Sequence, residues 1–217
     1  MTDSARIKNR LGELGVVSIL VIDRVDDALH VGEALMKGGL PSMEITFRTD
    51  SAAEGIKKLV RTFPDALVGA GTVLSTDTLL AAQDAGAQFV VTPGLSPIVV
   101  ERAIEIGMPI CPGVMTPSDV ERGLNYGLDV LKFFPAGEAG GPAMMKALSG
   151  PYAHTGVRFI PTGGVSSKNL AEYLSLPIVL ACGGTWIASK DRIKNQDWEG
   201  IEATAKETVE IFKQARG

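Results

Sequence analysis

The feature that most constrains this 217-residue chain is a repeat of short apolar segments at nearly constant spacing. Six such segments follow one another at intervals of 20 to 29 residues and are centred on Val68, Phe89, Ile110, Val130, Phe159 and Val179. An interval of this length holds one strand, one loop and one helix. Two earlier segments, Val16 to Ile22 and Met43 to Phe47, bring the strand candidates to eight. The pattern therefore predicts an α/β chain of eight strand-and-helix units.

Amphipathic segments fill the intervals between the strand candidates. The expected helices are Ala28 to Met36, Ala52 to Phe63, Thr76 to Asp84, Ile98 to Ile106, Ser118 to Tyr126, Ala143 to Leu148, Ser167 to Leu174 and Ile201 to Gln214. A further helical segment, Ile7 to Leu14, precedes the first strand. This order indicates a (β/α)8 TIM barrel with an extra N-terminal helix, and an open doubly wound sheet is the alternative. Because no linker or charge run divides the chain, residues 1–217 are expected to form a single domain.

Charge and hydropathy narrow the classes of partner and compartment. The formal net charge of -4 gives no electrostatic reason to expect nucleic acid or an anionic membrane as a partner. No apolar run approaches the roughly 20 residues of a membrane span, and the N-terminus lacks the apolar core of a signal peptide. The two cysteines, Cys111 and Cys182, lie in apolar strand-like runs, where buried thiols are favoured over a disulfide. We therefore expect a soluble, cytoplasmic protein.

One lysine stands inside an apolar run. Lys132 lies in Leu131-Lys-Phe-Phe-Pro135, a segment that predicts a buried strand. Burial disfavours the charged form of an amine, and a neutral lysine is a nucleophile for carbonyl carbons. The alternative is a strand-end lysine whose stem packs while its ammonium group reaches water. The polar residues on the other strands favour the nucleophile.

The second strand candidate alternates apolar and polar residues. Its apolar face holds Met43, Ile45 and Phe47, and its polar face holds Glu44, Thr46 and Arg48. Because helices cover the outside of a barrel, the polar face is expected to point inward. Glu44 and Arg48 either form an ion pair in the core or act on a ligand. In the second case the carboxylate moves protons and the guanidinium clamps a substrate carboxylate.

Small residues end three other strand candidates. The segment Val68-Gly-Ala-Gly-Thr72 leaves room for a ligand that the Thr72 hydroxyl can bind, although a tight turn explains it equally well. The seventh and eighth strands end in glycine pairs, Gly163-Gly164 and Gly183-Gly184. Such pairs let backbone N–H groups reach a phosphate, helped by a helix N-terminus. The alternative is that they only shape loops, but their placement favours a phosphorylated substrate.

The residues needed for metal or hydrolase chemistry do not occur in a matching arrangement. The two histidines, His30 and His154, have neither the spacing of metal ligands nor a place at an expected strand end. No Gly-x-Ser-x-Gly elbow, Walker loop or Cys-His pairing occurs. We therefore expect neither a metal nor a cofactor.

Six short motifs occur in a fixed order along the chain. They are Met43 to Thr49, Val68 to Thr72, Phe89 to Gly94, Leu131 to Pro135, Pro161 to Gly164 and Gly183 to Trp186. Together they resemble the 2-dehydro-3-deoxyphosphogluconate (KDPG) and 4-hydroxy-2-oxoglutarate (KHG) aldolase family. The resemblance extends from about Val16 to Trp186. It implies a homotrimeric (β/α)8 class I aldolase that works through a Schiff base without metal or cofactor.

The resemblance assigns roles at the end of the site that would hold a keto acid. Lys132 matches the Schiff-base lysine, and Glu44 matches the proton-transfer carboxylate. Arg48 and Thr72 match the groups that hold the pyruvyl carboxylate. Phe134 matches the aromatic residue beside the imine.

Other matches concern the remainder of the substrate. Pro93, within the Phe89 to Gly94 motif, is expected to contact the substrate, although turn formation alone explains its place. Thr162 matches the residue that governs stereochemistry at the carbon bearing the new hydroxyl, and its own hydroxyl favours the gluconate over the galactonate epimer. Thr185 stands where many members have serine and keeps a hydroxyl for phosphate, beside the glycine pairs.

The implied activity is reversible cleavage of 2-dehydro-3-deoxy-6-phosphogluconate to pyruvate and glyceraldehyde 3-phosphate. Cleavage of 4-hydroxy-2-oxoglutarate to pyruvate and glyoxylate is a second candidate. Three alternatives remain open: an aldolase for the galactonate epimer, a phosphosugar isomerase or synthase, and a non-catalytic sugar-phosphate binder. An imine-forming amine is needed by the aldolases alone.

Overall fold

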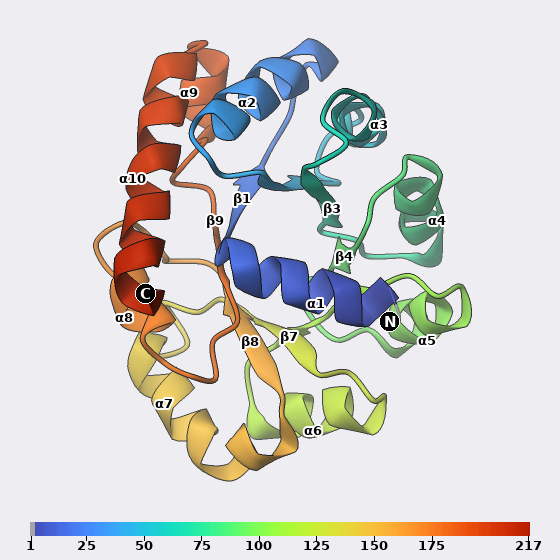
Figure 1. The fold of residues 1–217 in the computed structure, drawn as a ribbon. Coiled ribbons are helices and arrows are strands. Elements are labelled where there is room, and N and C mark those ends of the chain that lie inside the picture. Colours follow the sequence, from blue (N-terminus) through green and yellow to red (C-terminus); the bar gives the residue numbers. More distant parts are fainter. Residues whose placement is uncertain (1–2) are drawn as a thin grey trace.

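The computed structural model describes residues 3–217 and has an α/β fold (Figure 1). Residues 1 and 2 of the expected single domain lie outside the described residues. The strands are β1 (Val16–Leu20), β2 (Ser42–Thr46), β3 (Leu67–Gly71), β4 (Val90–Val91), β5 (Ile110–Cys111), β6 (Gly113–Val114), β7 (Val130–Phe133), β8 (Arg158–Pro161) and β9 (Cys182–Gly184). The helices are α1 (Asp3–Leu14), α2 (Val25–Lys37), α3 (Ala52–Thr62), α4 (Thr76–Asp84), α5 (Pro97–Glu105), α6 (Pro117–Asn125), α7 (Gly141–Tyr152), the 3-10 turn Ala153–Thr155, α8 (Leu170–Leu174), α9 (Lys190–Lys194) and α10 (Trp198–Arg216).

The strands form two parallel sheets that curl around a common interior. One sheet has the order β5-β4-β3-β2-β1-β9, and the other has the order β6-β7-β8. Isolated parallel bridges join Phe159 to Val179 and Thr162 to Gly183. Helices surround the strands on the outside (Figure 1). Because all pairings are parallel, the carboxyl ends of the strands meet on one side of the molecule.

The fifth expected strand, around Ile110, is present as β5 and is followed by a second short strand, β6. β5 pairs with β4 and β6 pairs with β7, and Pro112 separates the two. Proline has no N–H to donate to a ladder, and its carbonyl accepts a hydrogen bond from the Lys132 N–H at 2.9 Å. The boundary between the two sheets therefore falls at Pro112, and β6 was not predicted.

The strand expected around Val179 begins later, at Cys182. The Val179 N–H donates to the Leu176 carbonyl in a turn, and the Val179 carbonyl accepts from the guanidinium groups of Arg158 and Arg216. Val179 is nevertheless paired with Phe159 in an isolated parallel bridge. The predicted centre is thus in β-pairing, whereas the regular strand begins three residues later.

Helix α1 closes one end of the curled sheet. Ile7 and Leu11 are buried and pack against an interior layer of strand side chains formed by Val17, Leu67, Phe89, Val91, Cys111, Val130, Ile160 and Leu180. In Figure 1, α1 lies across the middle of the ring of helices. The expected extra N-terminal helix is present, and it covers the interior layer of strand side chains.

Three further features bear on the expectations. Cys111 and Cys182 are buried free thiols, as predicted. Helix α9 was not predicted, because five residues are too few to display a helical period; its N-cap is Ser189, whose hydroxyl accepts from the Arg192 N–H. Within residues 3–217, no helix has the length and apolar composition needed to cross a membrane.

Candidate active site

The carboxyl ends of the strands and the loops that follow them surround a pocket of about 360 Å³. Its lining consists of Ile19, Glu44, Thr46, Arg48, Thr72, Pro93, Lys132, Phe134, Thr162, Gly163, Gly164, Val165, Gly184 and Thr185. All of the predicted site residues except Gly183 are in this set. Residues from seven strands or the loops that follow them, distant in sequence, are therefore brought to one place.

Strand β2 directs its polar side chains into this pocket. Glu44, Thr46 and Arg48 line it, whereas Met43 and Ile45 are buried in the outer core, as the alternation predicts. Arg48 does not pair with Glu44 in the described part of the chain. Its Nε instead donates to Thr46 Oγ1 at 3.1 Å. The core ion bridge considered as an alternative is not formed.

Glu44 occupies a slot that a neighbouring glycine leaves open. The side chain is 4% exposed, and its Oε1 has no hydrogen-bond partner among residues 3–217. A Cβ on Gly71 would lie only 2.0 Å from Oε1, so glycine is required there. Burial raises the pKa of Glu44 above its ordinary 4.5, and the charges of Lys132 and then Arg48 oppose this rise. A raised pKa suits a carboxyl group that takes up and returns a proton.

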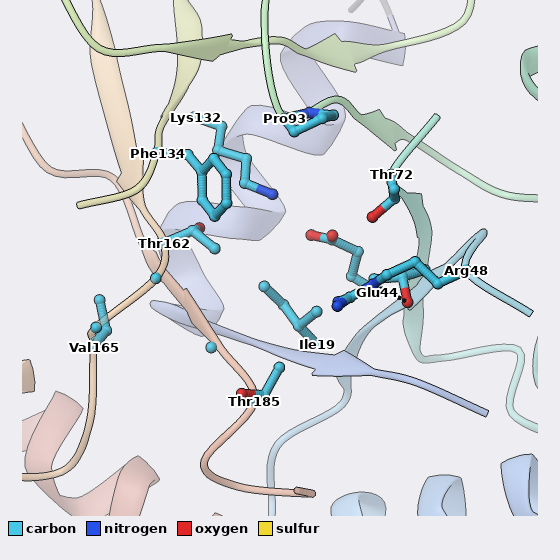
Figure 2. A pocket seen from close by; sticks show the side chains of 14 residues that line it. Ile19, Glu44, Arg48, Thr72, Pro93, Lys132, Phe134, Thr162, Val165 and Thr185 are labelled. Atoms are coloured by element: carbon cyan, nitrogen blue, oxygen red, sulfur yellow. Dashed lines mark hydrogen bonds between the residues drawn. The ribbon is translucent and has the colours of Figure 1, made fainter. Parts of the chain in front are cut away.

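Lys132, on β7, points into the same pocket. The residue is 6% exposed, which favours a lysine held within the pocket over a side chain that extends into bulk water. Its Nζ lies 5.0 Å from the centre of the Phe134 ring. Figure 2 shows the Lys132 amine and the Glu44 carboxylate pointing toward one another across the pocket. An amine and a carboxyl group are therefore available to one bound molecule.

Thr72 follows β3 directly and has an unusual backbone conformation. Its φ of 57° lies in the left-handed region, which is strained for a β-branched residue and is most often retained at functional sites. In Figure 2 its hydroxyl points toward the Glu44 carboxylate. Pro93 lines the pocket as well, and its loop packs so closely on β6 that a Cβ on Gly113 would lie 2.1 Å from the Pro93 carbonyl oxygen.

The other end of the pocket is lined by small, neutral residues. Gly163 and Gly164 have φ values of 85° and 74°, which favour glycine, and both line the pocket with Gly184 and Thr185. Gly183 does not line it. This residue lies within β9, between Val17 and Thr162, so its backbone belongs to the ladder. Its role is spatial, because a Cβ there would lie 2.7 Å from Thr162 Oγ1.

The expected helix N-terminus is not directly behind these glycines. Helix α8 begins only at Leu170. The intervening turn is closed by Asn169, whose Oδ1 accepts from the Ser166 N–H at 2.9 Å and whose Nδ2 donates to the Gly164 carbonyl at 2.9 Å. The glycine pair is therefore held by an amide side chain rather than by the start of a helix.

Two lining residues were not predicted at all. Ile19 on β1 and Val165 after β8 form apolar walls of the pocket. The alternation of β1 contains a usable signal for Ile19, since Val17 two residues earlier belongs to the interior layer. Val165 lies in an irregular turn and has no such signal. Thr46 was placed on the inward face but received no role.

Charge is confined to one end of the pocket. Lys132, Arg48 and Glu44 are the ionisable residues that line it. Nowhere in residues 3–217 do three or more His, Cys, Asp or Glu side chains gather in a way that could hold a metal ion. The arrangement combines an amine, a carboxyl group and a guanidinium at one end with neutral donors at the other.

Comparison with known proteins identifies close relatives. A family model described as KDPG and KHG aldolase matches residues 7–204. A 2-dehydro-3-deoxy-phosphogluconate aldolase of Treponema pallidum is 46% identical over 93% of this chain and 95% of its own. The structure of a KDPG aldolase from Legionella pneumophila, with pyruvate captured as a covalent carbinolamine intermediate, has a TM-score of 0.86 and 39% identity over 91% of this chain and 97% of its own. That of the aldolase of Zymomonas mobilis with 3-phosphoglycerate has a TM-score of 0.85 and 40% identity over 94% and 95%.

The raised pKa of Glu44 leads to a prediction about stability. Between the ordinary value of 4.5 and the raised value, the folded state binds more protons than the unfolded state, so folding loses stability as the pH rises. Glu44→Gln removes this loss. We therefore compare the free energy of unfolding of Glu44→Gln with that of the parent, both measured in urea. The difference in favour of the variant should be larger at about pH 7 than at about pH 4. The exposed Glu54→Gln is the matched control and should show no such pH dependence. A Glu44→Gln advantage that is absent or greatest at low pH would contradict the assignment.

Proposed function

This chain belongs to the KDPG and KHG aldolase family, and we propose that it cleaves 2-dehydro-3-deoxy-6-phosphogluconate to pyruvate and glyceraldehyde 3-phosphate through an imine on Lys132. It is a lyase of the Schiff-base class. The observation that carries the assignment of roles is the buried Lys132 amine facing Glu44 in one pocket. A class I aldolase needs a nucleophilic amine and an adjacent proton carrier.

The reaction begins at the C2 ketone of the substrate. The neutral Lys132 amine attacks C2, and loss of water from the carbinolamine gives a protonated imine. A covalent carbinolamine with pyruvate in the Legionella pneumophila relative supports this step. The low exposure of Lys132 keeps bulk water away from the carbon that the amine attacks.

Glu44 then moves the protons. It removes the proton of the C4 hydroxyl, the C3–C4 bond breaks toward the imine, and glyceraldehyde 3-phosphate leaves. The same carboxyl group returns the proton to C3 of the enamine, and hydrolysis of the imine releases pyruvate. A pKa raised by burial suits a carboxyl group that both accepts and donates a proton.

The two ends of the substrate bind to chemically different walls. Arg48 and Thr72 hold the carboxylate, and Phe134 and Pro93 pack beside the imine. Backbone N–H groups of Gly163, Gly164 and Gly184, with the Thr185 hydroxyl, hold the phosphate. Gly183 contributes space rather than a contact.

We also propose that the two sheets form one closed (β/α)8 barrel in a single domain. Counting β5 and β6 as one strand interrupted at Pro112 gives eight, and the bridge from Thr162 to Gly183 connects β8 to β9. A cytoplasmic location is supported by the two free thiols, Cys111 and Cys182, which a reducing compartment preserves.

Trapping with borohydride tests the imine. In the presence of pyruvate, the parent should gain a reduced pyruvate adduct on Lys132, detected by peptide mass spectrometry, whereas Lys132→Ala should have neither adduct nor turnover. The exposed Lys146→Ala is the control and should behave as the parent. Failure of the parent to form the adduct would favour the isomerase, the synthase or the non-catalytic binder.

Thr162 should set the preference between epimers. We expect kcat/KM for the gluconate substrate to exceed that for its galactonate epimer roughly fivefold, since one hydrogen bond contributes about 1 kcal/mol. Thr162→Val keeps the side-chain shape, removes the hydroxyl and should lower this ratio. A ratio that favours the galactonate epimer would instead support the alternative aldolase. Assaying 4-hydroxy-2-oxoglutarate in parallel tests the second substrate.

We also propose that the protein is a homotrimer, as the family resemblance implies. Two large apolar side chains are available for contacts between chains, since Leu74 is 63% exposed and Ile98 is 70% exposed. Sedimentation velocity should find three chains in each particle, and Leu74→Glu should shift the particle toward single chains. A parent that sediments as one chain would refute the trimer.

A further inference from the structure

Thr46 lines the pocket but takes no part in the chemistry described above. Its residue is only 1% exposed, and its hydroxyl makes two hydrogen bonds of opposite direction. The hydroxyl donates to the Leu20 carbonyl at 3.0 Å and accepts from Arg48 Nε at 3.1 Å. Because a hydroxyl has one proton, donation to Leu20 directs its lone pairs toward Arg48.

We propose that Thr46 is a positioning residue, which fixes the Arg48 guanidinium so that its two terminal nitrogens, Nη1 and Nη2, meet the carboxylate of the keto acid. This inference rests on the proposed function, in which Arg48 binds that carboxylate. Thr46 itself does not touch the substrate carboxylate.

The planar geometry of the Arg48 guanidinium leaves one edge, formed by Nη1 and Nη2, available to bind a carboxylate. Arginine has five N–H donors in a rigid plane, and one of them, at Nε, is committed to Thr46. Four N–H donors remain, two on Nη1 and two on Nη2. One from each nitrogen points in the same direction, and these two can donate parallel hydrogen bonds to the two oxygens of a carboxylate. In Figure 2 the end of Arg48 extends into the pocket over Ile19. Thr46 thus selects end-on rather than side-on binding.

Holding the guanidinium in advance also lowers the cost of binding. An arginine side chain loses considerable rotamer freedom when a ligand fixes it, and a bond formed before binding removes part of that loss. The local backbone permits this bond, because β2 ends at Thr46 and Arg48 follows in a tight turn. In that turn the Arg48 N–H donates to the Thr46 carbonyl at 2.8 Å, and both residues line the pocket.

Thr46 belongs to a set of three hydroxyl groups that bind β2 and its loop to β1. Thr46 donates to the carbonyl of Leu20, Thr49 to that of Ile22 and Ser51 to that of Asp23. Thr49 therefore anchors the chain in the same way as Thr46. It makes no hydrogen bond to Arg48, which makes it a matched control.

The test compares Thr46→Val with Thr49→Val. Each removes one hydroxyl and leaves one β1 carbonyl without its donor, but only Thr46→Val releases the guanidinium. We expect the pyruvate concentration for half-maximal borohydride trapping to rise about tenfold in Thr46→Val, as for loss of a charge-assisted hydrogen bond, and less than about twofold in Thr49→Val. Thr46→Ser should restore parent behaviour. The kcat of cleavage should change little, since the carboxylate is bound alike in ground and transition states.

A neutral substrate analogue separates positioning from general damage. Trapping of methyl pyruvate, which has no carboxylate, should be the same in Thr46→Val and the parent. In an Arg48→Ala background, Thr46→Val should have no further effect on pyruvate. Equal weakening by the two valine variants, or weakening with methyl pyruvate, would overturn the inference.

Arg48→Lys provides a second route if Thr46→Val does not fold. Lysine keeps the charge but has neither Nε nor a fork, so we expect weakening close to that of Arg48→Ala. Parent-like trapping in Arg48→Lys would overturn the end-on geometry. Unchanged pyruvate trapping in Arg48→Ala would instead overturn the carboxylate-binding role of Arg48, which belongs to the proposed function.

Discussion

The burial of an amine and a carboxyl group against one pocket is the interaction on which the rest of this molecule depends. Lys132 and Glu44 come from β7 and β2, which belong to different sheets, so the pair exists only when the sheets curl toward one another. Low exposure strengthens their mutual interaction and penalises a negative charge on Glu44. The direction of the Glu44 pKa records this balance, since burial outweighs the attraction of Lys132 and Arg48.

Glycine is as important to this pocket as the charged residues are. Because Gly71 has no side chain, the Glu44 carboxylate has space beside it, and Gly183 leaves space for the Thr162 side chain in the same way. Gly163 adopts a positive φ that other residues would resist. The polar groups are thus placed by strand alternation, and the missing side chains make room for them. A phosphate at the neutral end would be held without a nearby cation from the pocket lining.

Much of this arrangement follows from local sequence, and the exceptions have long-range causes. The inward placement of Glu44 required only the two-residue period of a strand, whereas Arg48 reaches the pocket from the turn that follows β2. The sequence does not tell where β9 stops, so it did not show that Gly183 lies within the strand and does not line the pocket. It also did not show that the Val179 carbonyl accepts a hydrogen bond from Arg216, 37 residues further along the chain. The strained φ of Thr72 likewise depends on its surroundings and has no sequence signature.

Helix α1 belongs to none of the strand-and-helix units, yet the electrostatics of the pocket depend on it. Ile7 and Leu11 of α1 pack against an interior layer that includes Cys111. Burial raises the pKa of Cys111 to about 12, and a charge on its thiol would interact with both Glu44 and Lys132. Without α1, water would reach this interior layer, and its high dielectric constant would weaken the electrostatic interactions among the charged groups of the pocket. A short helix outside the repeating units thus limits the access of water to the interior layer next to the reacting amine.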